Sequence, residues 1–272
     1  MQKIKLFSIA LITMLLSLPS FAQKTSKVRI ETNMGDIVVK LYKDTPKHKK
    51  KFLSEARKGY YDGSMFYRVI EDFIIQAGAK GAQDMSHGSR IGYGNPDFTV
   101  DDEIKTNHFC KRGALCAPRQ PDNKNPFKQS DISQFFIIQG KVYTQGELDT
   151  MELKRNIPIK KRIKKLYWTE EVKAEAKKLK EEKRIKEYNA LISKIKDQIQ
   201  TEYNLHPKLL KFTPEQRKAY TTIGGCPELD REYTIFGEVI KGWDVVEKIN
   251  KVKCDRFDRP WEDINIKVVV IQ

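Results

Sequence analysis

The sequence predicts a mainly β fold, a closed barrel accompanied by two helices and interrupted by one inserted helical unit. Short runs of β-forming residues recur along the chain with turn residues between them, which is typical of sandwiches and barrels. Only two short helical patterns lie among these runs, too few for a sheet of alternating strands and helices. Residues 151–221 have a different composition: they hold 20 Lys and Arg against 10 Asp and Glu, so they carry +10 of the net charge of +15.

The N-terminus has the pattern of a secretory signal. Lys3 and Lys5 precede an apolar run from Leu6 to Leu18, and small residues follow where a signal peptidase cleaves. The run is too short to span a bilayer comfortably. We therefore expect cleavage after Ala22 and export to the periplasm or another compartment outside the cytoplasm. The mature chain is expected to have no membrane span, because no later apolar run reaches about 18 residues.

The predicted strands begin with a hairpin. Val28, Ile30 and Thr32 alternate with charged residues, and a turn at residues 33–36 leads into a second alternating run, so one face of the hairpin is buried. Six further strands are expected, at Met65–Ile70, Phe73–Ala77, Gly113–Ala117, Gln134–Gln139, Tyr233–Val239 and Ile264–Ile271.

Two helices are expected between these strands. The first begins near Asp44 or Thr45, with Pro46 in its first turn, and ends at Gly59. The second spans roughly residues 243–251 and lies between the last two strands.

The inserted unit is expected to be a basic helical hairpin. Thr169 can cap a helix, and apolar residues recur at three- and four-residue steps from Ile185 to Ile199, so Glu170 to Tyr203 is predicted as one long helix. Three roles stay open: a solvated scaffold, an arm that docks unfolded or acidic client proteins, and a contact for anionic surfaces. Nucleic acid is not expected, because the unit lacks aromatic residues interleaved with basic ones.

Hydrolytic, metal and redox chemistry have little support in the sequence. The four His form no zinc-binding spacing, and phosphate loop, nucleophile elbow and dinucleotide fingerprint are all missing. His48 and His206 are expected in solvent. Cys110, Cys116, Cys226 and Cys254 have no metal-site spacing. One or two disulfides and free thiols both stay open, with Cys116 the best candidate for a buried thiol. No cofactor and no metal are expected.

Two segments carry unusual combinations of residues. Phe66–Gly78 places Arg68 on a strand with apolar neighbours, and Ser133–Ile138 is a second apolar strand with a polar start. Together these segments resemble the cyclophilin family of peptidyl-prolyl isomerases.

Three further segments agree with that family in the same order, namely Gly113–Arg119, Leu229–Gly237 and Gly242–Val246. The resemblance covers about residues 27–145 and 222–272. It implies an eight-stranded antiparallel barrel capped by two helices, with a proline-binding groove on its outer face.

The resemblance also implies site residues. Arg68 corresponds to the catalytic arginine of the family. The implied substrate-binding residues are Phe73, Ile74, Gln76, Pro118, Arg119, Phe136, Leu229 and Tyr233. Ile74 replaces a Met of the family and Tyr233 replaces a His. Glu228 stands where a Trp lines the cyclosporin site, so weak cyclosporin binding is expected.

These observations predict a signal peptide at 1–22, a barrel built from 23–147 and 222–272, and a basic helical insertion at 148–221. The predicted activity is acceleration of X-Pro bond rotation in exported proteins, by Arg-assisted twisting of the imide in an apolar proline pocket. The alternative is a chaperone module that binds proline segments with little or no isomerase activity. The expected partners are proline-containing segments of unfolded or folding exported proteins, and the chain is expected to act as a monomer.

Overall fold

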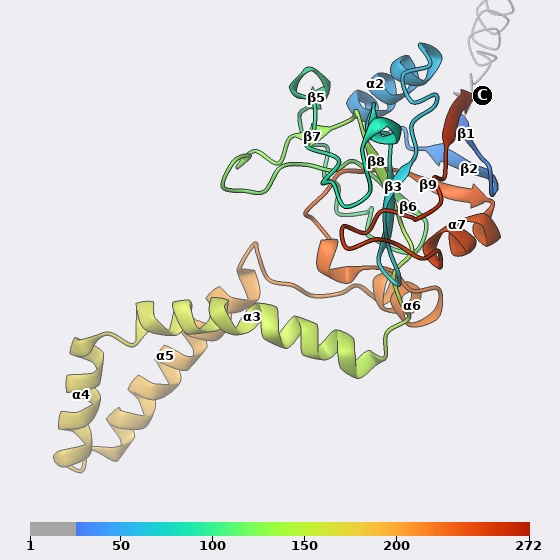
Figure 1. The fold of residues 1–272 in the computed structure, drawn as a ribbon. Helices are drawn as coiled ribbons and strands as arrows, with labels where there is room; N and C mark the ends of the chain where they lie inside the picture. The colour runs from blue at the N-terminus through green and yellow to red at the C-terminus, as the bar shows by residue number, and fades with distance from the viewer. Residues whose placement is uncertain (1–25) are drawn as a thin grey trace, which may run out of the picture.

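The computed structural model describes residues 26–272 (Figure 1). The predicted signal peptide at 1–22 lies outside the described residues. Within 26–272, no helix combines the length and the apolar character that crossing a bilayer requires.

Eight antiparallel strands form one sheet in the order β10-β1-β2-β9-β6-β8-β4-β3. They are β1 (Lys27–Thr32), β2 (Gly35–Leu41), β3 (Phe66–Ile70), β4 (Ile74–Ala77), β6 (Ala114–Cys116), β8 (Phe135–Ile138), β9 (Ile235–Lys241) and β10 (Ile266–Val270). The two edge strands meet, because Met65 bridges Asn265 and the Ile266 N–H donates to the Ser64 carbonyl at 2.7 Å. The predicted eight-stranded antiparallel barrel is therefore confirmed, nearly closed on itself.

Alternation along the strands fills the barrel interior. Val28, Ile30, Ile37 and Val39 of the first hairpin are fully buried, as the alternating pattern predicts. The turn needs Gly35, whose φ is +125° and whose added Cβ would lie 2.8 Å from a methyl carbon of Val245. A separate pair of short strands, β5 (Thr99–Val100) and β7 (Ser130–Asp131), lies in the long loops.

Two helices cap the barrel, as predicted. In α2 (Pro46–Arg57), Pro46 occupies the first turn and Gly59 follows the end with a φ of +69°. Phe52 of α2 is fully buried against the barrel. The second capping helix is α7 (Trp243–Asn250), and three short 3₁₀ helices, η1 (Ala82–Asp84), η2 (Pro96–Phe98) and η3 (Pro227–Leu229), lie in the loops.

His48 is fully buried, so its predicted solvent exposure was wrong. Its Nδ1 lies 2.8 Å from Oε2 of Glu103, and that same oxygen accepts the His48 backbone N–H at 3.0 Å. The carboxylate thus satisfies an amide at the start of α2 as well as the ring. Burial lowers the pKa of His48. His206 is only partly exposed.

The insertion contains three helices that project from the barrel, α3 (Gln145–Tyr167), α4 (Glu170–Glu181) and α5 (Ile185–Leu205) (Figure 1). A fourth helix, α6 (Pro214–Thr222), leads back to the barrel. The predicted single helix over 170–203 was wrong. The chain turns at Lys183, whose φ is +56°, and α4 and α5 form the helical hairpin. The turn lets apolar side chains of the two helices pack together and become buried. In one straight helix these side chains would have no partner.

The base of the insertion packs tightly on the barrel. Leu148 of α3 and Tyr220 of α6 are fully buried in a cluster with Phe109, Tyr143 and Phe212. The predicted boundaries between barrel and insertion, at 148 and 221, therefore fall within an apolar cluster that both parts share. Farther from the barrel, α3, α4 and α5 share a second apolar cluster around Ile163, Ile195 and Ile199.

Candidate active site

All nine residues that the sequence placed in a groove line one pocket of about 180 Å³. They come from β3, the turn between β3 and β4, β4 itself, β8, the loop that follows β6, and the segment of η3 and loop that precedes β9. Strand alternation separates this pocket from the barrel interior. On β4, Ile75 and Ala77 belong to the central core, whereas Ile74 belongs to the cluster beneath the pocket. On β8, Phe135 lies in the core and Phe136 under the pocket.

The floor of the pocket is apolar. Ile74 and Phe136 are almost fully buried, and Phe73, Leu229 and Tyr233 pack against them while keeping part of their surface in solvent. The Tyr233 ring meets Phe136 edge to face, with ring centroids 5.3 Å apart. A pocket of this size and character suits one small apolar ring.

Arg68 lies at the edge of this pocket, on β3, directly across from Gln76 on β4. Its Nε is 3.3 Å from Oδ2 of Asp258, and both side chains are 42% exposed. The guanidinium is therefore held by a carboxylate on one side and reachable from solvent on the other.

The amide of Gln76 is held by a buried network. Its Nε2 donates to the hydroxyl oxygen of Tyr67 and lies 3.3 Å from Oε1 of Gln134, and the Tyr67 hydroxyl donates to the same Gln134 oxygen. Burial raises the pKa of Tyr67, so its hydroxyl keeps its proton as a donor. The network fixes the direction in which Gln76 can bond a peptide.

The side chain of Arg119 is anchored next to the pocket. Its Nη2 lies 2.9 Å from Oε2 of Glu232, its Nε donates to the Glu232 carbonyl at 2.6 Å, and its guanidinium lies 5.3 Å from the Tyr233 ring centre. The backbone N–H and C=O of Arg119 have no hydrogen bond to any residue of the described chain. The backbone groups of Arg119 are therefore free to pair with a bound peptide.

Glu232, which the sequence analysis did not single out, anchors Arg119 beside the pocket. Besides Arg119, it contacts Lys128 Nζ at 2.7 Å and Arg155 Nη2 at 3.2 Å. Arg155 belongs to α3, so the insertion contacts the carboxylate that anchors Arg119 beside the pocket. No local pattern marks this carboxylate, because its three cationic partners lie 77 to 113 positions away in the chain.

A loop after η1 supplies further lining that the sequence analysis did not identify. Gly92 and Gly94 border the pocket, and a Cβ on Gly92 would lie too close to the Tyr67 hydroxyl. Asp131 of β7 holds this loop in place by accepting the Asn95 N–H at 2.8 Å. The turn signature of residues 92–96, Gly-Tyr-Gly-Asn-Pro, is the signal that marks this loop. Asp131, Gln120 and Gln134 complete the lining.

Asp230 connects the loop of Leu229 to α6. The buried carboxylate accepts the Cys110 N–H and the Tyr220 hydroxyl, each at 2.7 Å, and the Gln216 side-chain amide at 3.2 Å. Burial raises the pKa of Asp230 to about 6. The pocket wall at Leu229 therefore depends on contacts at the base of the insertion.

All four cysteines are free thiols. Cys110, Cys116 and Cys226 are buried in the cluster beneath the pocket, which confirms the expectation for Cys116. A hydrogen bond with Cys116, together with burial, raises the pKa of Cys110. Glu228 is exposed and accepts the Tyr143 hydroxyl at 3.3 Å. Across residues 26–272, no group of three or more His, Cys, Asp or Glu is arranged to hold a metal ion.

A nearly closed antiparallel barrel, with an apolar pocket beside an arginine and a fixed glutamine amide, defines the cyclophilin class of fold and site. Comparison with protein families agrees. The family model for "Cyclophilin type peptidyl-prolyl cis-trans isomerase/CLD" matches residues 27–157 and 161–271. The chain belongs to this family of peptidyl-prolyl cis-trans isomerases.

Similar proteins carry the name of the same family, and one solved structure shares the fold. A Staphylococcus haemolyticus protein named "Putative peptidyl-prolyl cis-trans isomerase" is 28% identical over 247 residues, which is 90% of this chain and 91% of the relative. A Staphylococcus aureus protein of the same name has the same identity and coverage. The crystal structure of a Cryptosporidium parvum cyclophilin-type isomerase has a TM-score of 0.51 at 21% identity and covers 92% of this chain and 99% of its own, which shows the shared fold.

Proposed function

We propose that this protein accelerates rotation about X-Pro bonds in exported proteins, and that Arg68 acts on the twisted state of the bond. Family membership supports the isomerase activity. The observation that carries the mechanism is the convergence of Arg68, the apolar floor and the Gln76 amide on one pocket.

The reaction needs no covalent bond to the protein. Rotation about the peptide bond faces a barrier of about 18–20 kcal/mol, because amide resonance must be broken. As the imide twists, its nitrogen lone pair is released from the carbonyl and becomes a hydrogen-bond acceptor. A donor that reaches this lone pair binds the twisted state better than either planar state, which is the requirement for catalysis.

Arg68 suits this role because its guanidinium always carries charge and offers several donors in a rigid plane. Asp258 restrains the guanidinium through Nε, which leaves its terminal nitrogens for substrate. The pyrrolidine ring would sit on Ile74 and Phe136, while Gln76 and the Arg119 backbone hold the chain on either side of the bond. Part of the substrate is thereby fixed while the rest rotates.

The proposed setting outside the cytoplasm depends on the sequence pattern of residues 1–22. Expression of the full chain in a bacterial host, followed by N-terminal sequencing of the protein from the periplasmic fraction, should give a chain that starts at Gln23. A chain retaining Met1 in the cytoplasmic fraction would contradict export. The proposed clients are unfolded or folding exported polypeptides that contain proline, bound by a monomer.

The mechanism is tested by a protease-coupled assay with a proline-containing tetrapeptide. Arg68→Ala should lower kcat/KM by at least about 100-fold, the usual effect of losing one charged transition-state donor. Arg68→Lys should restore little, because an ammonium lacks the planar arrangement of donors. Arg29→Ala is the matched control: Arg29 also lies on a strand, pairs with a carboxylate and is 39% exposed.

Near-wild-type activity of Arg68→Ala in a folded protein would overturn the mechanism. A wild-type protein that binds the peptide without accelerating rotation would instead favour the proline-binding chaperone module.

A further inference from the structure

A second pocket, of about 360 Å³, lies in the insertion and shares no lining residue with the groove. Its apolar lining consists of Trp168, at the junction of α3 and α4, and Ile192, Ile195 and Ile199 of α5. The three isoleucines follow a helical repeat and face the same side of α5. Ile195 and Ile199 are almost fully buried at the bottom, whereas Trp168 and Ile192 keep part of their surface exposed.

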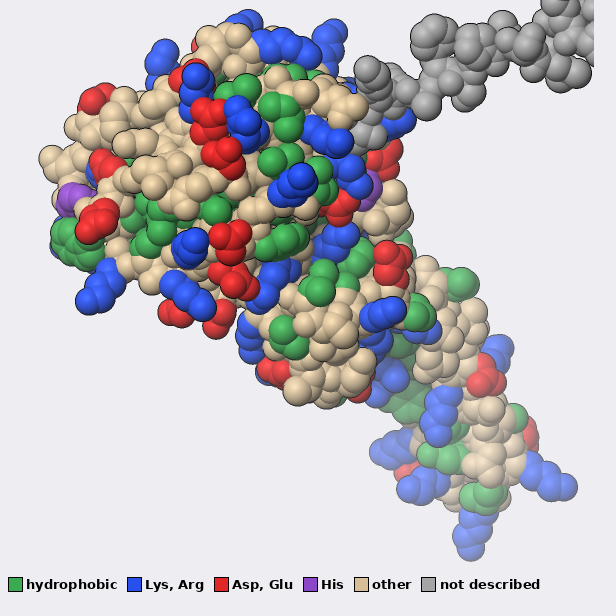
Figure 2. Space-filling model, turned by 90° about the vertical axis from the view of Figure 1, so that its right-hand side faces the viewer, with side chains coloured by type: hydrophobic (Ala, Val, Ile, Leu, Met, Phe, Trp, Pro, Cys, Tyr) green, Lys and Arg blue, Asp and Glu red, His purple; other side chains and the backbone are tan. Residues whose placement is uncertain are grey.

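Every charged residue that lines this pocket is a lysine. They are Lys164 and Lys165 of α3, Lys173 of α4 and Lys196 of α5, all exposed. Lys173 pairs with Glu170 at 2.7 Å. The other three have no carboxylate within 4.0 Å among residues 26–272. Lys and Arg side chains also project from the insertion on the face seen in Figure 2.

Helix electrostatics alone do not explain this cluster. Lys164 and Lys165 lie in the last turn of α3, where the helix dipole favours cations. Lys173, however, lies in the first turn of α4, where the dipole disfavours a cation, and Lys196 lies in the middle of α5. Four lysines from three helices thus surround one apolar floor without an acidic neighbour in the lining.

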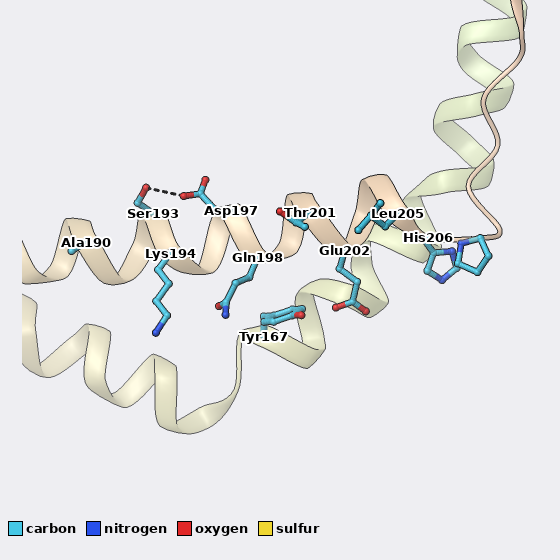
Figure 3. A pocket seen from close by; sticks show the side chains of 11 residues that line it. Tyr167, Ala190, Ser193, Lys194, Asp197, Gln198, Thr201, Glu202, Leu205 and His206 are labelled. Atoms are coloured by element: carbon cyan, nitrogen blue, oxygen red, sulfur yellow. Dashed lines mark hydrogen bonds between the residues drawn. The ribbon is translucent and has the colours of Figure 1, made fainter.

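The opposite face of α5 provides an internal comparison. A larger hollow of about 860 Å³ lies there, and Figure 3 shows Lys194, Gln198 and Glu202 along it. Its lining mixes Lys194 with the carboxylates of Asp197 and Glu202, so it has no preferred sign of ligand charge. Of these two hollows against α5, the Trp168 pocket is the one that combines an apolar floor with one sign of charge.

We propose that the Trp168 pocket binds a short peptide segment in which a large apolar side chain is flanked by carboxylates. The volume suits one or two apolar side chains. The uniform lysine rim is complementary to Asp and Glu on either side of them. A membrane surface fits poorly, because interfacial binding requires apolar side chains that protrude, and here Ile195 and Ile199 lie at the bottom of a concavity. This binding does not depend on the isomerase activity proposed above.

The test uses fluorescence anisotropy with labelled hexapeptides that contain no proline and so do not require the groove. Asp-Glu-Phe-Leu-Asp-Glu should bind the full mature chain. Lys-Lys-Phe-Leu-Lys-Lys and Asp-Glu-Ser-Ser-Asp-Glu should bind at least about tenfold more weakly, since they lose the charge or the apolar contribution. Affinity should also fall as salt rises from 20 to about 500 mM, because exposed charges are screened.

Two charge reversals on α5 make the test site-specific. Lys196→Glu should weaken binding of the acidic apolar peptide by about tenfold, because one attraction becomes a repulsion. Lys194→Glu makes the same change in net charge on the opposite face of α5. It should weaken binding of this peptide by less than about twofold. Both side chains are exposed, so neither variant should unfold the protein, and tetrapeptide turnover should stay at the wild-type level in both.

Equal losses in the two variants would overturn the proposal in favour of a diffuse positive field. Equal binding of the serine peptide would show that the apolar floor is not used. A third outcome would overturn the proposal in favour of a lipid surface: the protein binds none of the peptides, wild type sediments with anionic phosphatidylserine vesicles, and Lys196→Glu does not.

Discussion

Glu232 should set how well the groove holds its peptide. The perturbation is Glu232→Gln, which keeps the size of the side chain and removes its charge. In the wild-type protein this carboxylate faces three cations, Arg119, Lys128 and Arg155. Its loss leaves the Arg119 guanidinium with the exposed Asp122 as its remaining carboxylate partner among the described residues. The backbone at Arg119, proposed to pair with the peptide, should then be less well fixed.

The size of the effect follows from burial. The Arg119 side chain is 7% exposed and that of Glu232 is 27% exposed. Breaking a fully buried ion pair costs about 3–5 kcal/mol, whereas an exposed pair contributes about 0–1 kcal/mol. This intermediate case should cost about 2 kcal/mol. If all of that appears in peptide binding, KM rises at most about 30-fold. Arg68 is untouched, so kcat should change little.

The assay is protease-coupled tetrapeptide turnover with kcat and KM resolved separately. The matched control is Glu228→Gln, since Glu228 lies in the same loop, is exposed and contacts the Tyr143 hydroxyl rather than a cation. We expect a raised KM for Glu232→Gln alone. Equal KM values for the two variants, or a loss confined to kcat, would refute the reasoning.

Three further outcomes are expected. Asp258→Ala should lower kcat by no more than about fivefold in the tetrapeptide assay, because the half-exposed pair with Arg68 contributes at most about 1 kcal/mol; a 100-fold loss would show that Asp258 is part of the chemistry. The fold raises the pKa of Asp230 to about 6, so the protonated carboxyl stabilises the protein fully below pH 4, and this stabilisation is lost as pH rises through 6. Urea unfolding should therefore show that the free energy of unfolding of wild type falls by up to about 3 kcal/mol relative to Asp230→Asn between pH 4 and 7. Parallel pH profiles of the two proteins would contradict a buried carboxyl. Cyclosporin should inhibit wild type weakly and Glu228→Trp more strongly in a titration of the same activity, because an indole supplies a donor and apolar area that a carboxylate lacks; tight inhibition of wild type would contradict this.

The barrel could be predicted from the sequence because its signals are local. The first hairpin buries every second residue, and each predicted strand lies within a few residues of an observed one. Arg68, Phe73 and Gln76 lie within one hairpin, so a single segment displays them together. The remaining groove residues were found through the family resemblance, because the loops that bring Arg119 and Leu229 to the pocket carry no periodic pattern of their own.

What the sequence could not show depends on distant partners. The break at Lys183 falls among good helix formers, and it arises because α4 and α5 bury apolar side chains against each other and α3. His48 has a charged sequence neighbourhood, but the carboxylate that pairs with it lies 55 positions away. Glu232 forms ion pairs with cations from three separate segments. Such contacts follow from the closed fold and leave no trace in local spacing.

The central claim, that Arg68 stabilises the twisted bond more than it binds the peptide, is tested most directly by exchange NMR. The cis–trans exchange rate of a saturating proline tetrapeptide and its Kd are measured in one titration, for wild type and Arg68→Ala. We expect the bound exchange rate to fall by at least about 100-fold, with Kd changed by less than about fivefold. An unchanged bound exchange rate, or a loss of activity explained by Kd alone, would contradict the claim.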